Sequence, residues 1–165
     1  MVIKEIRNRR STRSYKKIMP ADNLIIELIK AAQFAPSSHH NSSWEFIIVT
    51  DNKTKQKFYD LLGQSYLLEV PVIIIPLIDT TQSTGPVQDI SVASENIFIQ
   101  AASLGLGTVW KNVTDLEIIE KIKSLLKIPK KFMLINMIPV GYPKTVRRPH
   151  KDNDFDPKKI HKEVF

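Results

Sequence analysis

Apolar residues recur every three or four positions in several stretches of this chain, a spacing that predicts amphipathic helices. The pattern is strongest around Ile90, Ile97 and Leu104, where additional apolar neighbours widen the face and indicate a buried central helix. Prolines and capping residues set the ends of the other helices. The first predicted helix is short and begins near Ile3, and the second runs from Pro20 to Ala35. The third, capped by Asp51 or Asn52, extends to about Leu62, and the fourth runs from just after Pro86 to Leu104. The last is opened by a capping box at Thr114-Asp115-Leu116-Glu117 and extends to Leu126.

Short segments rich in β-branched residues predict strands between these helices. Residues 71–79 form an almost continuous apolar run, typical of a strand that is covered on both faces. Because proline has no backbone N–H, Pro76 predicts that this strand lies at a sheet edge or has an unpaired point. The other predicted strands are 45–50, 106–110 and 132–140. The interleaving of helices and strands favours an α/β or α+β domain in three layers.

Length and composition fit one soluble globular domain over residues 1–165. Residues 143–165 are polar and punctuated by proline, and we expect an extended C-terminal arm there. The chain has no cysteine, which excludes disulfides, iron–sulfur clusters and thiolate zinc sites and suits a reducing cytoplasm. The N-terminus lacks the apolar core of a signal peptide, and the longest apolar run is too short to span a bilayer, so we expect no membrane association.

The net charge of +7 favours an anionic partner, which the charge alone leaves open between nucleic acid, a phosphorylated cofactor and an acidic substrate. The sharpest concentration is Arg9-Arg10-Ser11-Thr12-Arg13, since guanidinium forks match phosphate oxygens two at a time and hydroxyls complete the coordination. A solvated basic face is the competing interpretation. Stacking of single-stranded nucleic acid on Tyr15 is a further alternative, but one aromatic residue gives it little support.

Other candidate motifs are weaker. Gly105-Leu106-Gly107 follows a predicted helix, whereas a dinucleotide-binding fingerprint follows a strand, and its third glycine position holds Trp110. Ser37 and Ser38 beside His39 and His40 suggest a nucleophile and a base, but residues adjacent in a loop rarely face one another and no third group is identifiable. No carboxylate stands at ligand spacing from these histidines, so we expect no metal site.

Taken in order, several landmarks resemble the flavin-dependent nitroreductase family. Arg9-Arg10-Ser11-Thr12-Arg13 is similar to its Arg-Arg-Ser-x-Arg signature, and Ala35-Pro36-Ser37-Ser38 with Trp44 is similar to its Ala-Pro-Ser-Ser loop. The remaining landmarks are Pro71-Val72-Ile73-Ile74, the helix from Asp89 to Gly105-Leu106-Gly107, Ile128-Pro129 and Gly141-Tyr142-Pro143. Together they span nearly the whole chain.

The resemblance implies an α+β, nitroreductase-like three-layer sandwich with a central mixed, mainly antiparallel β-sheet flanked by helices. It also implies a cytoplasmic homodimer that holds FMN at the subunit interface and binds no nucleic acid. NADH or NADPH would reduce the flavin, and a nitroaromatic, quinone or similar small acceptor would then take the electrons in a ping-pong cycle. Because the cofactor carries this chemistry, no catalytic side chain is expected.

Family positions imply the residues that bind the cofactor. Arg9, Arg10, Ser11 and Arg13 would contact the phosphate, ribityl chain and pyrimidine edge of FMN. The other implied contacts are Pro36, Ser37, Ser38 and His40 from the partner subunit, and Thr108, Val109 and Trp110 along the isoalloxazine. Many family members carry a late arginine for the phosphate. Arg147, Arg148 and Lys151 are the candidates to replace it here, and we select Arg148 and Lys151.

Two departures from the family pattern bear on function. His40 replaces the usual asparagine, and the connection from Asp79 to Pro86 is short where many relatives insert a helix over the flavin. We therefore expect a more open flavin face. The alternative functions are a flavin-binding sensor or carrier with little turnover and, with least support, a basic nucleic-acid-binding domain.

Overall fold

The computed structural model describes all residues 1–165. Its centre is a six-stranded sheet in the order β1-β2-β6-β3, with β4 paired to β6 and β5 paired to β2. Every pairing between strands is antiparallel, and the parallel contact is an isolated bridge between Ser11 and Thr108. The strands are β1 (Trp44–Val49), β2 (Val72–Asp79), β3 (Gly107–Thr108), β4 (Lys111–Asn112), β5 (Phe132–Met133) and β6 (Asn136–Gly141).

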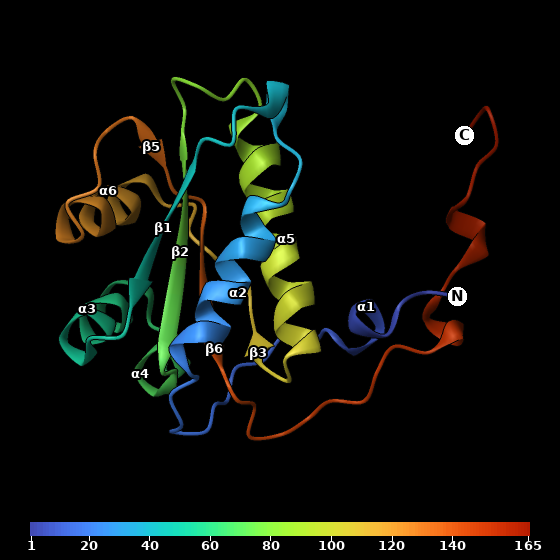
Figure 1. The fold of residues 1–165 in the computed structure, drawn as a ribbon, viewed down its shortest axis with the longest axis horizontal. Helices are drawn as coiled ribbons and strands as arrows, with labels where there is room; N and C mark the ends of the chain where they lie inside the picture. Colours follow the sequence, from blue (N-terminus) through green and yellow to red (C-terminus); the bar gives the residue numbers. More distant parts are fainter.

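Helices cover both faces of this sheet (Figure 1). The helices α2 (Asp22–Gln33) and α5 (Pro86–Ser103) lie on one face, and α3 (Asn52–Leu62), α4 (Tyr66–Glu69) and α6 (Leu116–Leu125) lie on the other. The short α1 (Lys4–Asn8) lies between α5, which it contacts, and the C-terminal arm, which contains the 3₁₀ turns Asp152–Asp154 and Pro157–Lys159. This arrangement confirms the α+β three-layer sandwich.

Strand β2 shows why its sequence is apolar at almost every position. Val72, Ile74 and Ile78 pack in the core beneath α2 and α5. The intervening Ile73 and Ile75 pack in the second core, beneath α3, α4 and α6. Alternate side chains of a strand point to opposite faces, so a strand covered on both sides has no solvent-facing row of polar residues, and the polar residue of β2 is Asp79 at its end.

Pro76 lies at an unpaired point of β2, as the sequence predicts. On one side β2 pairs with β1 along its length. On the other side it pairs with β6 at residues 72–74 and with β5 at residues 78–79, which leaves residues 75–77 without a strand partner there. A central strand therefore accommodates a residue that has no N–H to donate.

Several boundaries differ from the sequence-based expectation. The capping-box assignment is wrong, because Asp115 rather than Thr114 is the N-cap of α6 and its carboxylate accepts hydrogen bonds from the Glu117 and Ile118 amides. The strand expected at 106–110 is shortened to β3, and β4 follows beyond its expected end. The strand expected at 132–140 is divided into β5 and β6. Helix α4 was not predicted, because four residues are too few to show a period. No helix has the length and apolarity that a bilayer crossing requires.

Candidate functional site

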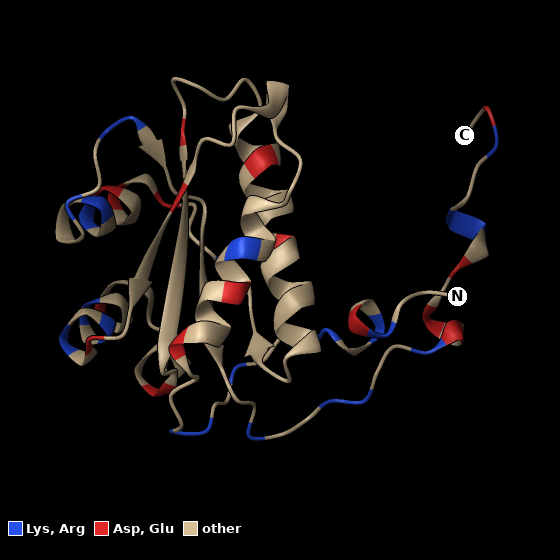
Figure 2. Cartoon of the chain, viewed as in Figure 1, with Lys and Arg blue, Asp and Glu red and all other residues tan.

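The arginine segment lies beside the end of α5. Helix α1 ends at Asn8, and Arg9 follows as its C-cap, with its amide donating to the Glu5 carbonyl at 2.9 Å. The chain then runs extended along β3, where Ser11 forms a bridge with Thr108 and the Thr12 amide donates to the Thr108 carbonyl at 2.8 Å. Basic residues continue along the loop toward α2 and along the first part of the arm (Figure 2). The cluster is thereby fixed against the sheet through its backbone.

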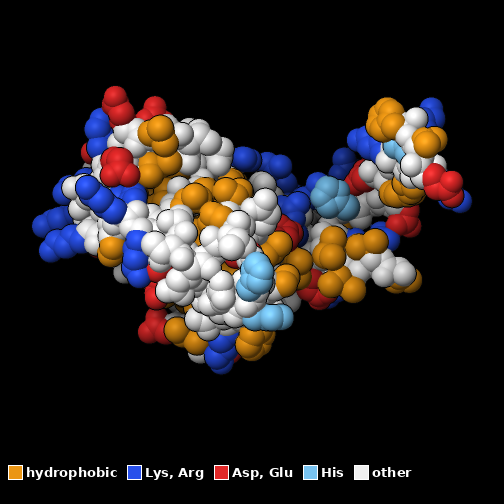
Figure 3. Space-filling model, turned by 90° about the horizontal axis from the view of Figure 1, so that it is seen from above, with side chains coloured by type: hydrophobic (Ala, Val, Ile, Leu, Met, Phe, Trp, Pro, Cys, Tyr) orange, Lys and Arg blue, Asp and Glu red, His pale blue; other side chains and the backbone are white.

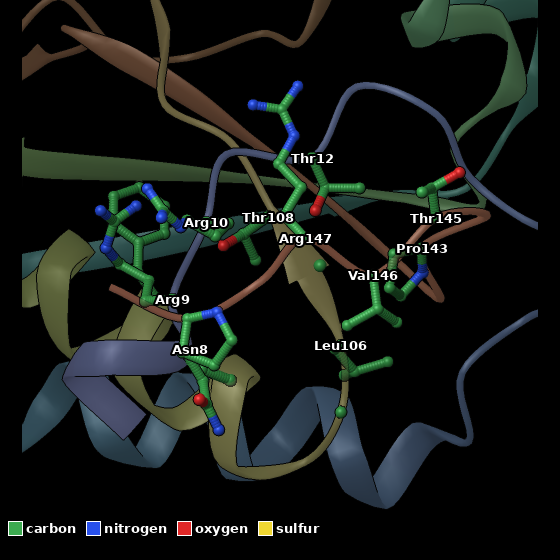
Figure 4. A pocket seen from close by; sticks show the side chains of 15 residues that line it. Asn8, Arg9, Arg10, Thr12, Leu106, Thr108, Pro143, Thr145, Val146 and Arg147 are labelled. Carbon is green, nitrogen blue, oxygen red and sulfur yellow. The ribbon is translucent and has the colours of Figure 1, made fainter. Parts of the chain in front are cut away.

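A cavity of about 310 Å³ opens between this segment, the α5–β3 turn and the arm. Arg9, Arg10 and Arg147 line it, and no carboxylate does. Arg9 and Arg10 lie side by side, whereas Arg147 approaches from the arm, apart from that pair (Figure 4). The other lining residues are Asn8, Thr12, Phe98, Ala102, Gly105, Leu106, Gly107, Thr108, Pro143, Thr145, Val146 and Pro149. Three guanidinium groups without an acid in the lining make this cavity suited to a phosphate.

A second cavity of about 260 Å³ adjoins the first and shares Arg9, Phe98 and Thr108 with it. Its remaining lining residues are Ser11, Glu95, Val109 and Trp110. The Phe98 and Trp110 rings meet edge to face, with centroids 6.1 Å apart and planes at 63°. Together the two cavities form an elongated site with a basic end and an aromatic end.

Glu95 is the acid of the aromatic end. Its carboxylate lies 3.9 Å from the Arg9 Nε atom. Burial raises the pKa of Glu95, and the Arg9 guanidinium offsets that rise only in part. Glu95, Phe98 and Ala102 are spaced three and four residues apart, so they share one face of α5 and line the site together.

The loop at residues 36–40 lies elsewhere. It packs on the first turn of α5, where the Ser38 amide donates to the Asp89 carboxylate at 2.9 Å and the Ser83 hydroxyl donates to the same group at 2.6 Å. From Asp89 to Phe98 the helix rises about 14 Å and turns by about 180°. Within one chain, Pro36, Ser37, Ser38 and His40 therefore line neither cavity.

The Ser38 hydroxyl lies 3.0 Å from Nδ1 of His39, so these neighbours do face one another, contrary to expectation. The Thr84 hydroxyl contacts both, with a short hydrogen bond to Ser38 and a distance of 3.5 Å to His39 Nδ1. The Asp89 carboxylate contacts Ser38 only through its backbone amide. Because no acid orients the His39 ring, the three residues do not form a catalytic triad.

The remaining candidates are scattered. Arg13 is exposed and lines neither cavity; it lies near Tyr66, whose pKa is raised by burial and partly held down by that guanidinium. Arg148 places its backbone carbonyl, rather than its side chain, against Arg10. Lys151 lines a separate groove between the arm and α1. Nowhere do three His, Asp or Glu side chains gather in a way that could hold a metal ion.

Sequence reasoning missed several residues that the structure brings to the site. Glu95 and Phe98 were not among the assigned contacts. Thr12 belonged to the arginine segment but had no assigned cofactor contact, and Arg147 was one of three candidates for the late basic contact without being the preferred one. The spacing of Glu95 and Phe98 on α5 was a usable signal, because both precede the glycine turn on one helical face. The return of the arm to the arginine segment had no local signal, since it joins residues far apart in the chain.

Comparison with known proteins gives a consistent result. The model of the Nitroreductase family matches residues 6–73 and 59–142. A protein of Methanothermobacter thermautotrophicus, provisionally named NADH dehydrogenase/NAD(P)H nitroreductase, is 36% identical over 169 residues, which span 99% of this chain and 87% of that one.

Two solved structures share the fold over their whole length. One, from Parabacteroides distasonis and with the same provisional name, has a TM-score of 0.91 at 36% identity and covers 98% of this chain and 96% of its own. The other, an FMN-dependent nitroreductase of Clostridium difficile, has a TM-score of 0.88 at 32% identity and covers 98% of each chain.

Proposed function

The chain belongs to the nitroreductase family, and from that premise we propose that it is an FMN-dependent oxidoreductase. It uses NADH or NADPH to reduce nitroaromatic, quinone or similar small acceptors. The observation that carries the proposal is the elongated site, whose carboxylate-free basic end and aromatic end match the phosphate and the planar ring of FMN. When bound, FMN supplies the two-electron chemistry that joins hydride donor to acceptor.

The residues of this chain bind and orient the cofactor. Arg9 and Arg10 hold the phosphate, and Arg147 completes the basic wall from the arm. Ser11 and Thr108 line the middle of the site, and Trp110 closes its aromatic end. We assign the late basic contact to Arg147 in preference to Arg148 and Lys151, because neither of the latter lines the cavity. The role of Arg13 at the ring edge stays a prediction.

The active form in this proposal is a homodimer. Residues 36–40 cannot reach the cavities of their own chain, so a flavin contact from this loop requires a second copy. Two further segments carry hydrophobic side chains that one chain leaves uncovered: the N-terminus and the arm (Figure 3). These exposed residues are Met1, Val2, Ile3, Ile6, Val146, Phe155, Ile160, Val164 and Phe165. Their burial would supply the apolar area that a stable dimer needs.

Rapid anaerobic mixing tests the enzyme assignment. Protein loaded with FMN is mixed with NADH or NADPH, and the flavin absorbance at about 450 nm is followed. At a turnover typical of enzymes, the absorbance change is complete on the order of seconds or faster. We expect bleaching by at least one nucleotide and recovery of colour when a nitroaromatic or quinone is added. Bound flavin that neither nucleotide reduces would instead identify a flavin-binding sensor or carrier.

A further inference from the structure

The arm crosses the basic cavity between two anchors. The first anchor is a short stretch of backbone pairing at the end of β6. There the Lys16 amide donates to the Tyr142 carbonyl at 2.8 Å, and the Lys144 amide donates to the Ser14 carbonyl at 3.0 Å. A bridge between Tyr15 and Pro143 lies between these bonds. The arm therefore leaves the body of the protein at a fixed point beside the arginine segment.

The second anchor joins the arm to α1 and its end. The Arg10 Nε atom donates to the Arg148 carbonyl at 3.1 Å, and the His150 amide donates to the Arg7 carbonyl at 2.9 Å. The Arg7 guanidinium also pairs with the Asp152 carboxylate at 2.5 Å. Beyond residue 148 this is the one ion pair between the arm and the rest of the chain, and residues 151–165 are all exposed.

Residues 145–147 connect the two anchors and form a strap. All three line the basic cavity, where the strap carries Val146 and Arg147 past Thr12 and Leu106 (Figure 4). None of the three makes a hydrogen bond or ion pair with the rest of the chain. The position of the strap, and with it of Arg147, is consequently set by the anchors on either side.

We propose that Arg7 and Asp152 are positioning residues that hold this strap, and Arg147 on it, at the wall of the basic cavity. The inference rests on the proposed FMN function, because the phosphate is the ligand whose binding it affects. Neither residue lines the basic cavity, so both act through the strap. The side chains are 28% and 87% exposed, and removing such a pair changes an equilibrium about two- to fivefold.

The test uses the full chain with Arg7→Ala, Asp152→Ala and the charge-exchanged double variant Arg7→Asp/Asp152→Arg. FMN affinity is measured by flavin fluorescence quenching. Strap mobility is measured without cofactor, as the rate of tryptic cleavage after Arg147, since the bond after Arg148 precedes Pro149 and resists trypsin. The control is Asp156→Ala, which removes an arm carboxylate that caps only the turn at Pro157–Lys159.

We expect each single variant to bind FMN about two- to fivefold more weakly and to be cleaved faster. The exchanged pair should restore both properties at least in part, and the Asp156 control should match the wild type. Single variants that bind FMN and resist trypsin as the wild type does would overturn the inference while leaving the proposed function intact. A wild-type protein that binds no FMN would overturn both.

Discussion

Gly107 lies directly against Thr12. A β-carbon on Gly107 would stand 2.5 Å from the Thr12 hydroxyl oxygen and 2.8 Å from its Cβ and Cγ2 atoms. Strand β3 and the arginine segment are thus in contact at a residue without a side chain, and the bond from the Thr12 amide to the Thr108 carbonyl depends on this approach. The glycine turn is therefore part of the cofactor site through packing.

Gly107→Ala should separate the two segments, because contacts at these distances force a backbone shift. We expect a loss of about 1–3 kcal/mol in the free energy of unfolding, together with weaker FMN binding. Denaturant unfolding and FMN titration measure the two effects. The double variant Gly107→Ala/Thr12→Gly removes the clash and should recover part of each.

Gly85→Ala is the matched control for this substitution. Its nearest neighbour would be the Gln88 Oε1 atom at 3.4 Å, which is the end of a flexible side chain. This variant should stay close to the wild type. A Gly107→Ala protein with unchanged stability and FMN affinity would show that the close approach has no bearing on the site.

Arg9→Ala should bind FMN roughly 10- to 150-fold more weakly, which corresponds to the loss of one charge-assisted hydrogen bond worth about 1.5–3 kcal/mol. The Arg9 side chain is part of the surface and its ion pair with Glu95 is long, so thermal unfolding without cofactor should change little. Fluorescence titration with FMN gives the affinity. Lys57→Ala removes an equal charge from the exposed side of α3 and should leave FMN binding as it is.

The loop at residues 36–42 should depend on the buried Asp89. Asp89→Ala leaves the Ser38 amide and the Ser83 hydroxyl without their acceptor, and we expect a loss of about 2–3 kcal/mol in unfolding free energy. Urea denaturation measures it. Ser91→Ala removes only a hydroxyl that bonds back to Val87 within α5, so its effect should be small. Equal stability of the two variants would contradict this role for Asp89.

Asp79 should make the fold sensitive to acid. The Lys131 ammonium at 2.7 Å and the Thr81 hydroxyl and amide lower the pKa of the Asp79 carboxyl to about 2. Because the folded state lowers this pKa below its ordinary value of 3.8, the ionised carboxylate stabilises the fold above about pH 4 and this stabilisation is lost as the pH falls toward 2.

Asp79→Asn should therefore flatten the pH dependence of the urea midpoint between about pH 4 and pH 2. Asp22→Asn, on the exposed first turn of α2, serves as the control. If the Asp79 variant and the wild type lose stability with the same slope over this range, the carboxylate is not a source of the acid sensitivity.

Much of the fold was predictable because local patterns carried it. The apolar run of β2 predicted burial on both faces, and Pro76 predicted the gap between the β6 and β5 pairings. Asp51, offered as a cap, does accept the Thr54 amide at the start of α3. The capping box predicted at Thr114 was wrong, because the choice of Asp115 as the cap depends on backbone geometry that spacing does not contain.

The site was predictable only in part. Arg9, Arg10, Ser11 and the turn at Thr108 were identified by motif, and the structure brings them together. The resemblance implied a contribution of the arm through Arg148 and Lys151, but Arg147 is the arm arginine that lines the cavity. The contacts of Arg148 with Arg10 and of His150 and Asp152 with Arg7 join residues more than 130 positions apart, so no local pattern predicts them. A contact between residues 36–40 and the flavin requires a second copy of the chain. Sedimentation of the FMN-loaded protein tests this requirement and should show a dimer.

The most direct test of the account is whether the protein binds FMN through the basic cavity. Purified protein is denatured to release any flavin, and stripped protein is titrated with FMN and, separately, with riboflavin, which lacks the phosphate. The account predicts a yellow protein with saturable FMN binding, and affinity for riboflavin that is weaker in the wild type but equal to that for FMN when Arg9, Arg10 and Arg147 are all replaced by alanine. A colourless protein that takes up neither flavin, or one that binds both equally well with its arginines intact, would contradict it.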